Sequence, residues 1–235
     1  MTDFSIMQIN PHFFAYLCPA MKKLIIFDFD GTLADTRELI VRTNQEAMKR
    51  VGYPVASAES IIATIGLPLK ESILALFPDL PESELPKWIP VYREVFEALK
   101  HQIVPELFPN VKETLACLHG RGYILSVASS RGTSSLNGFM EDMGLAPFIS
   151  YVLGADDVKH AKPDPEPVLK TLKDLGIDAS DALVVGDMPV DIMMGRGAGV
   201  KTCGVTFGNS DRDALLSAGA DFVLDDIAGL LGIHF

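Results

Sequence analysis

Cysteine is scarce in this sequence, and the few cysteines are scattered. Of 235 residues three are cysteine, and Cys18, Cys117 and Cys203 lie far apart without C-x-x-C spacing. This pattern argues against a disulfide framework or a zinc site, and it favours a reducing compartment. The five histidines show no metal-ligand spacing either. We therefore expect a cytoplasmic protein.

Basic residues are outnumbered by acidic ones, and long apolar runs are missing. The chain has 20 Lys and Arg against 31 Asp and Glu, a formal net charge of −11. Phosphate backbones repel such a surface, which argues against nucleic acid as a partner. No apolar run approaches the ~18 residues that span a bilayer, so we expect no membrane partner. The length suits one α/β domain with an insertion, or two small domains.

The first twenty residues stand apart from the rest. Their apolar run, residues 13–18, is short, and no Lys or Arg precedes it, so it does not fit a secretory signal. Residues 21–23 (MKK) are a more natural start for the first strand. We expect residues 1–20 to be a dispensable N-terminal extension.

The most informative segment is DFDGTL at residues 28–33. It follows the apolar run 24–27, which predicts a buried parallel strand. Asp28 and Asp30 therefore lie at the end of a strand, where α/β sheets bind ligands, and Gly31 permits the turn. Two charges about 4 Å apart repel by roughly 4 kcal/mol at an effective dielectric of about 20, and a hard cation removes this cost. An ordinary Asp-Gly turn is the alternative.

The hydrophobic pattern predicts two kinds of structure along the chain. Helices are expected over 37–51 and over 58–104, with breaks near 66–68 and 78–81, and no strand is expected between 37 and 105. Beyond 106, helices alternate with strands: helices over 111–119, 133–143, 166–175, 190–196 and 212–217, strands over 123–128, 151–153, 182–185, 201–205 and 222–224, and a last helical turn over 227–231.

This alternation predicts the fold class α/β, with a doubly wound parallel sheet and right-handed crossovers. The sheet domain is expected to comprise residues 21–36 and 106–235. Residues 37–105 are expected to form a small all-helical domain inserted into it.

Polar groups recur where the predicted sheet can gather them on one edge. After the Asp28 segment come Ser129, Lys162 before a helix, and Asp187 and Asp191 in GDMPVD. Each has an ordinary explanation by itself. Ser129 can be a helix N-cap, Lys162 a solvated loop lysine, and the two aspartates cap and first-turn acids. Their order and their placement after strands favour a common site.

The series DxDGT, Ser after a strand, Lys-Pro and GDxxxD resembles the haloacid dehalogenase-like hydrolase superfamily over residues 21–230. The helical insertion resembles the α-helical cap of one branch of that superfamily. Residues 66–69 (GLPL) and 162–167 (KPDPEP) look most like its phosphoglycolate phosphatase and pyrophosphatase group. The resemblance implies a Rossmann-like core that carries this cap.

The resemblance also implies site residues. Asp28 would be the nucleophile that forms an aspartyl-phosphate. Mg²⁺ would be held by Asp28, Asp187 and the backbone carbonyl of Asp30, while Asp191 would bind the ion or orient its water shell. The free carboxyl of Asp30 would act as general acid and then as general base. The residues assigned to phosphate binding are Ser129, Lys162 and Thr32, the last also fixing the loop.

These assignments imply a Mg²⁺-dependent phosphatase of small phosphomonoesters, similar to phosphoglycolate phosphatase. Inorganic pyrophosphatase and a phosphomutase of the β-phosphoglucomutase type are alternatives, and a silent module that binds a phosphorylated metabolite is a third. The acid at Asp30 favours phosphoryl transfer, because dehalogenases of the superfamily lack it. The expected partner is a small phosphorylated metabolite, and the expected state is a monomer or homodimer.

Overall fold

A sheet of six parallel strands forms the centre of the computed structural model, which describes residues 23–235. The extension predicted at residues 1–20 lies outside the described residues. The strand order is β5-β4-β1-β6-β7-β8. Their bounds are β1 Leu24–Phe27, β4 Ile124–Ala128, β5 Tyr151–Leu153, β6 Ala182–Gly186, β7 Lys201–Val205 and β8 Phe222–Leu224. The predicted α/β class with a doubly wound parallel sheet is confirmed, and all six strands lie where the pattern predicts them.

The central strand β1 is apolar along its whole length because both of its faces are covered. Its four residues are buried. Ile25 and Phe27 belong to one hydrophobic cluster, and Leu24 and Ile26 belong to the other, as the two-residue alternation of a strand requires.

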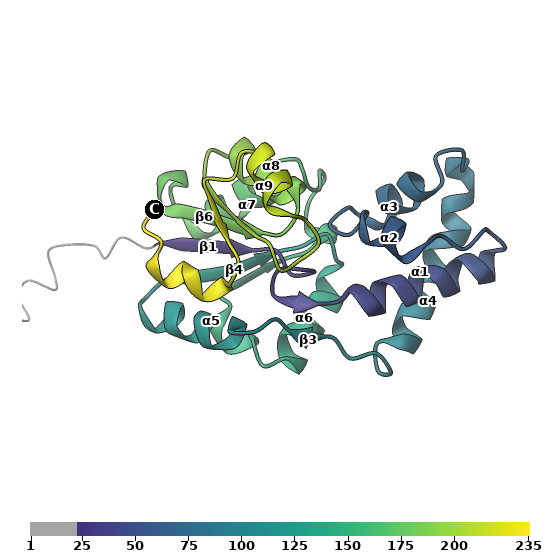
Figure 1. The fold of residues 1–235 in the computed structure, drawn as a ribbon, viewed down its shortest axis with the longest axis horizontal. Helices are drawn as coiled ribbons and strands as arrows, with labels where there is room; N and C mark the ends of the chain where they lie inside the picture. The colour runs from purple at the N-terminus through teal and green to yellow at the C-terminus, as the bar shows by residue number, and fades with distance from the viewer. Residues whose placement is uncertain (1–22) are drawn as a thin grey trace, which may run out of the picture.

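Helices cover both faces of the sheet (Figure 1). On one face lie α5 (Val111–Gly120), α6 (Thr133–Asp142) and the 3₁₀ helix η6 (Ile227–Gly232), whose apolar residues join the larger cluster. On the other face lie α7 (Glu166–Leu175) and α8 (Pro189–Gly197), and α9 (Arg212–Ser217) packs against β7. Three short 3₁₀ helices lie in the connections: η3 Ala146–Phe148, η4 Ala155–Asp157 and η5 Ala179–Asp181.

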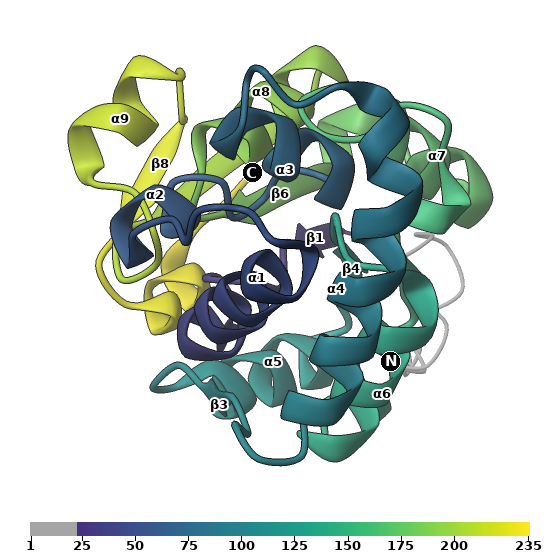
Figure 2. The same ribbon diagram turned by 90° about the vertical axis from the view of Figure 1, so that its right-hand side faces the viewer.

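A separate group of helices lies beyond the carboxyl end of β1 (Figures 1 and 2). Its members are α1 Arg37–Val51, α2 Ala58–Ile62, α3 Leu69–Leu76, η2 Glu82–Glu84 and α4 Leu85–Leu99. They have their own core around buried Trp88, whose ring centroid lies 4.8 Å from that of Tyr53 and 5.1 Å from that of Phe77. Residues 37–105, all of them described, form no strand, as predicted. We call this group the cap helices.

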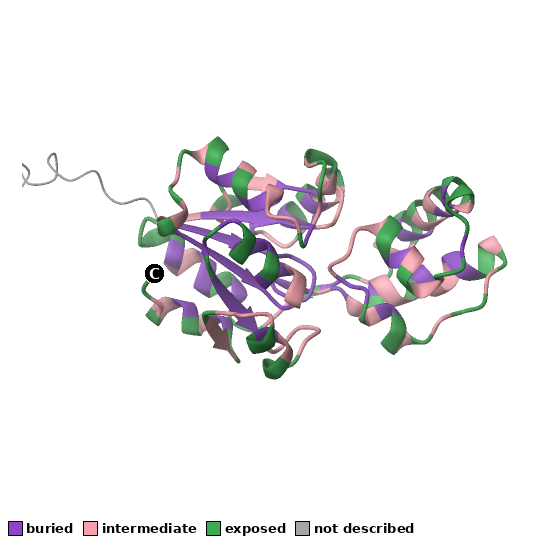
Figure 3. Cartoon of the chain, turned by 90° about the horizontal axis from the view of Figure 1, so that it is seen from above, coloured by how far each residue is buried: buried purple, intermediate pink, exposed green. Residues whose placement is uncertain are grey.

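A two-stranded antiparallel ribbon joins the cap helices to the sheet, and the sequence pattern missed it. It consists of β2 (Ala34–Asp35) and β3 (Glu106–Leu107). Strands of two residues are too short to show any periodicity, and these two pair only because the chain leaves and re-enters the sheet side by side. Figure 3 shows the link as a narrow connection between two bodies. The exact domain boundaries stay a prediction.

Among residues 23–235, no helix combines the length and the apolar content that crossing a bilayer requires.

Candidate active site

Three aspartates meet at the carboxyl ends of β1 and β6. Asp28 follows β1, Asp187 follows β6, and Asp191 lies in the first turn of α8. The two strands are neighbours with Phe27 beside Val185, so the residues that follow them emerge together. One oxygen from each carboxylate lies within 4.8 Å of the other two, and all three residues are buried. The structure therefore brings together three of the four residues predicted as metal ligands.

Lys162 enters this cluster from the loop before α7. Its Nζ lies 2.5 Å from Oδ1 of Asp28 and 2.7 Å from Oδ1 of Asp191. With 4 % of its surface exposed, it is not a solvated loop lysine. Burial alone lowers the pKa of Lys162, but Asp191 and Asp28 together outweigh burial and raise it above its usual value. The ammonium group is therefore held charged between two carboxylates.

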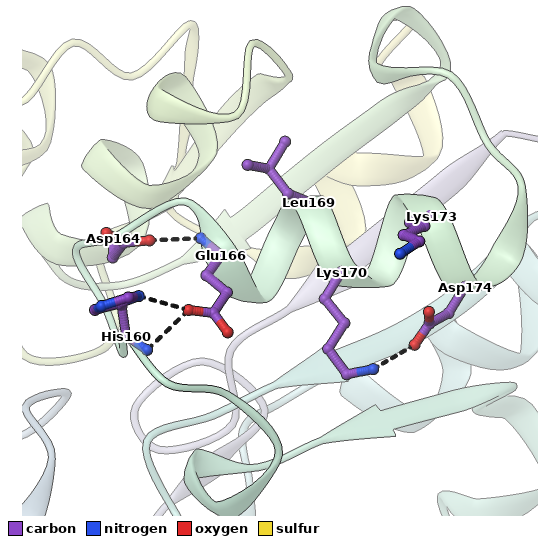
Figure 4. Close-up of a pocket in the computed structure, with 7 residues that line it drawn as sticks. All are labelled: His160, Asp164, Glu166, Leu169, Lys170, Lys173 and Asp174. Atoms are coloured by element: carbon purple, nitrogen blue, oxygen red, sulfur yellow. Dashed lines mark hydrogen bonds and ion pairs between the residues drawn. The ribbon is translucent and has the colours of Figure 1, made fainter.

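The loop that carries Lys162 is fixed from the outside by the start of α7 (Figure 4). Glu166 accepts backbone N–H groups from Lys159 and His160, each at 2.9 Å, and its carboxylate also contacts the His160 ring at 2.8 Å. Asp164 accepts the N–H of Glu166 at 2.9 Å. These residues line a surface pocket that continues along α7 to Asp174, and no predicted site residue lines it. We assign this His-Asp-Glu cluster to holding the loop.

Asp187 receives hydrogen bonds from two loops. Thr32 Oγ1 donates to its Oδ1 at 3.0 Å, and the backbone N–H and Nδ2 of Asn209 both donate to its Oδ2 at 2.8 Å. Thr32 therefore links its own loop to the residue that follows β6. The sequence missed Asn209, because it lies in a loop after β7 that carries no recognisable motif.

Gly31 is required where these loops meet. Its φ is +93°, a left-handed conformation that glycine adopts without strain. A Cβ at this position would lie 2.3 Å from Oδ2 of Asp187 and 2.3 Å from Nδ2 of Asn209. The glycine of the DxDGT motif therefore both permits the turn and leaves room for the Asp187 carboxylate.

The Asp30 carboxylate is not a member of the cluster of Asp28, Asp187 and Asp191. Its Oδ1 accepts Thr36 Oγ1 at 2.6 Å and Arg131 Nη2 at 2.5 Å, and its Oδ2 accepts Arg131 Nε at 3.1 Å. The sequence identified neither Thr36 nor Arg131. Arg131 directly follows Ser129 and Ser130, and that adjacency was the one signal available.

Ser129 lies at the end of β4, beside β1, and is buried. Its Oγ accepts the N–H of Arg131 at 3.2 Å, and the N-cap of α6 is Gly132, so Ser129 is not a helix cap. The next residue, Ser130, donates its hydroxyl to the carbonyl of Gly66, in the loop between the cap helices α2 and α3, at 2.6 Å. The loop after β4 therefore contacts the cap insertion as well as the sheet domain that it belongs to.

Burial and mutual repulsion set the charges of the site. Burial raises the pKa of Asp28 well above its usual value, Lys162 opposes this, and the neighbouring aspartates add to it. Burial and Asp191 raise the pKa of Asp187 to about 7, against the hydrogen bonds of Asn209 and Thr32. If all three carboxylates are ionised, their negative charge exceeds the single positive charge that Lys162 supplies.

Asp191 has a second contact that belongs to helix capping. Its Oδ2 accepts the backbone N–H of Met188 at 3.1 Å, at the start of α8. Oδ2 of Asp191 therefore acts as the helix-capping acid of the first turn of α8. Its other oxygen, Oδ1, contacts Lys162.

The donor set of this cluster fits a hard divalent cation. All the candidate ligand atoms are carboxylate oxygens, which Mg²⁺ prefers. A cation would also offset the repulsion that, together with burial as the larger cause, raises the pKa of Asp28 and Asp187. The residues present therefore fit the predicted Mg²⁺.

Comparisons with known proteins identify the family, sequence relatives and fold relatives of this chain. The sequence model of the haloacid dehalogenase-like hydrolases matches residues 25–205. The "Probable phosphatase IndB" of Dickeya dadantii is 38% identical over 219 residues, with 90% of this chain and 93% of that protein covered. "Pyrophosphatase PpaX" of Bacillus velezensis is 35% identical over 209 residues, covering 89% and 94% of the two chains. A solved structure described as a "predicted phosphoglycolate phosphatase" from Haemophilus somnus superposes with a TM-score of 0.80 at 27% identity, covering 92% of this chain and 99% of that one.

Proposed function

This chain belongs to the haloacid dehalogenase-like hydrolase family, and we propose that it is a Mg²⁺-dependent phosphatase of small phosphomonoesters. The observation that carries the proposal is the buried cluster of Asp28, Asp187 and Asp191 around a single Lys162. Such a surplus of buried negative charge is costly unless a cation compensates it. Phosphoryl transfer to a carboxylate needs that cation too, since nucleophile and substrate are both anionic.

In this proposal Asp28, Asp187 and Asp191 hold Mg²⁺ together with the backbone carbonyl of Asp30. When bound, the ion supplies charge neutralisation for the incoming phosphoryl group. Lys162, held charged at 2.5 Å from Asp28, neutralises charge that develops on the transferring group. Ser129 donates its hydroxyl hydrogen to a phosphoryl oxygen, while Thr32 keeps the Asp187 carboxylate in place.

The reaction has two steps. An Oδ of Asp28 attacks phosphorus, the bond from phosphorus to the leaving oxygen breaks, and the Asp30 carboxyl gives that oxygen a proton. Water then attacks the aspartyl-phosphate, Asp30 takes a proton from it, and the bond between phosphorus and Asp28 breaks. Phosphate leaves, and both carboxyl groups return to their initial states.

The proposed substrate is a small anionic phosphomonoester of the phosphoglycolate type, handled in the cytoplasm by a monomer or homodimer. The "Pyrophosphatase PpaX" relative supports inorganic pyrophosphate as the second candidate. A phosphomutase would use the same residues but would need a bisphosphate activator, so release of free phosphate without an activator separates the two classes. Release of phosphate in this assay would also exclude a silent binding module.

The test is phosphate release from phosphoglycolate, pyrophosphate and p-nitrophenyl phosphate with Mg²⁺. We expect Asp28→Asn to abolish turnover while the protein stays folded, and EDTA to silence the wild type reversibly. Asp225→Asn is the matched control, because Asp225 is an exposed aspartate that pairs with Arg212 outside the site. Normal turnover by the Asp28 variant, or full activity in EDTA, would overturn the proposal.

A further inference from the structure

Arg131 is a largely buried cation whose guanidinium contacts the carboxylate of Asp30. Their side chains are 10 % and 12 % exposed. Nη2 lies 2.5 Å from Oδ1 and Nε lies 3.1 Å from Oδ2, so the contact is a fork with one N–H for each oxygen. A forked pair fixes the plane and rotation of a carboxylate, which a single contact does not.

Three aromatic rings surround the guanidinium of Arg131. Its Cζ lies 4.9 Å from the ring centroid of Phe139, 5.1 Å from that of Phe96 and 5.9 Å from that of Phe29. Phe139 belongs to α6, Phe29 lies between the two aspartates of the DxDGT motif, and Phe96 belongs to the cap helix α4. Cation–π contacts with rings of the sheet domain and of the cap helix α4 therefore restrict the motion of the Arg131 side chain.

The hydrogen bonds around Asp30 leave one direction open. A carboxylate offers about four acceptor positions, two on each oxygen. Thr36 and Arg131 Nη2 occupy both positions on Oδ1, and Arg131 Nε occupies one on Oδ2. Among the contacts of residues 23–235, the remaining acceptor position of this carboxylate is on Oδ2.

We propose that Arg131 is a positioning residue that directs Oδ2 of Asp30 at the reacting oxygen, and that both proton transfers run through this atom. The inference rests on the proposed phosphatase function. In the first step the proton on Oδ2 moves to the leaving oxygen as its bond to phosphorus breaks. In the second step Oδ2 takes a proton from the attacking water, which restores the carboxylic acid.

The experiment compares substrates whose leaving groups differ in their need for a proton. p-Nitrophenolate leaves without protonation, whereas the alkoxide of phosphoglycolate does not. In Arg131→Met, Asp30 loses both hydrogen bonds from Arg131. Protonation of the leaving oxygen and activation of the attacking water should therefore both slow. We expect a rapid burst of about one p-nitrophenolate per site, then turnover slowed about 10²- to 10⁴-fold, the usual contribution of general acid–base catalysis. With phosphoglycolate we expect slow turnover without a burst and with KM little changed.

Three further variants separate positioning from a structural role. Arg131→Lys keeps the charge without the fork and should recover part of the lost turnover. Arg131→Met combined with Asp30→Asn should be no slower than Asp30→Asn alone, because Arg131 acts through Asp30. Arg212→Met removes an exposed pair, in which Nη2 of Arg212 donates to both oxygens of Asp225, and it should behave as wild type.

Each result decides the inference. Wild-type turnover by Arg131→Met on both substrates would overturn it. So would loss of the burst in a folded variant, or additive losses in the double variant, since both would place Arg131 in phosphoryl transfer itself. If the wild type released no phosphate from any substrate, the proposed function would fail instead, and the two failures are therefore distinguishable.

Discussion

Titration of Asp187 should make the metal-free protein less stable as the pH rises. The pKa of Asp187 in the folded protein is about 7, raised from 3.8 by burial and then by Asp191. Between these values the folded state holds a proton that the unfolded state has released. The free energy of unfolding therefore falls as the pH rises through this window, and it is highest below the unfolded pKa.

The size of the effect follows from the two pKa values. At about 1.4 kcal/mol for each pKa unit, a rise from 3.8 to about 7 amounts to about 4 kcal/mol at neutral pH. Of this, about 2.5 kcal/mol is lost between pH ~5 and pH ~7.5. Mg²⁺ binds the ionised carboxylates, so its stabilising effect should be larger at the higher pH. At about a hundred times its Kd, an ion that binds only the folded state adds about 2.7 kcal/mol.

The assay is urea unfolding in EDTA and in excess Mg²⁺ at the two pH values, for the wild type and for Asp187→Asn. The variant is a fair control because Thr32 can accept the new amide N–H instead of donating to the carboxylate, since a hydroxyl does both. In EDTA, we expect the free energy of unfolding to fall between the two pH values by about 2.5 kcal/mol more for the wild type than for the variant. Equal pH dependence in the two proteins would refute the reasoning, as would equal stabilisation by Mg²⁺ at both pH values.

Other perturbations test the contacts around the site. Lys162→Met leaves Asp28 and Asp191 buried without their cation, so we expect a loss of about 3–5 kcal/mol in urea unfolding, partly recovered with Mg²⁺; an unchanged midpoint would contradict this. Gly31→Ala forces a side chain into the left-handed region against the Asp187 carboxylate and the Asn209 amide, so both activity and about 1–3 kcal/mol of stability should be lost, measured in parallel. Ser130→Ala removes the 2.6 Å hydrogen bond to the cap helices, at a cost of about 1 kcal/mol. We expect a raised KM for phosphoglycolate with little change in kcat, and an unaltered KM would count against it.

Regular elements could be predicted because their causes are local. Strand β1 is apolar throughout since both faces are buried, and the helix Glu166–Leu175 ends at Gly176, whose φ is +64°. These features depend on side-chain pattern and backbone freedom within a few residues. The ribbon of β2 and β3 could not be predicted, because its two strands pair across the whole cap insertion and carry no pattern of their own.

The sequence by itself determined which chemistry this protein carries. Asp28 and Asp187 follow strands, and parallel strands bring their carboxyl ends to one edge of the sheet, so a cluster of carboxylates with Lys162 could be derived from order alone. Only the tertiary structure decided which groups orient them. Arg131 reaches Asp30 across 101 positions of the chain, and Asn209 reaches Asp187 across 22, through loops whose paths depend on packing. Periodicity and motifs describe neighbours along the chain, whereas a forked hydrogen bond between loops depends on distances that only the folded chain establishes.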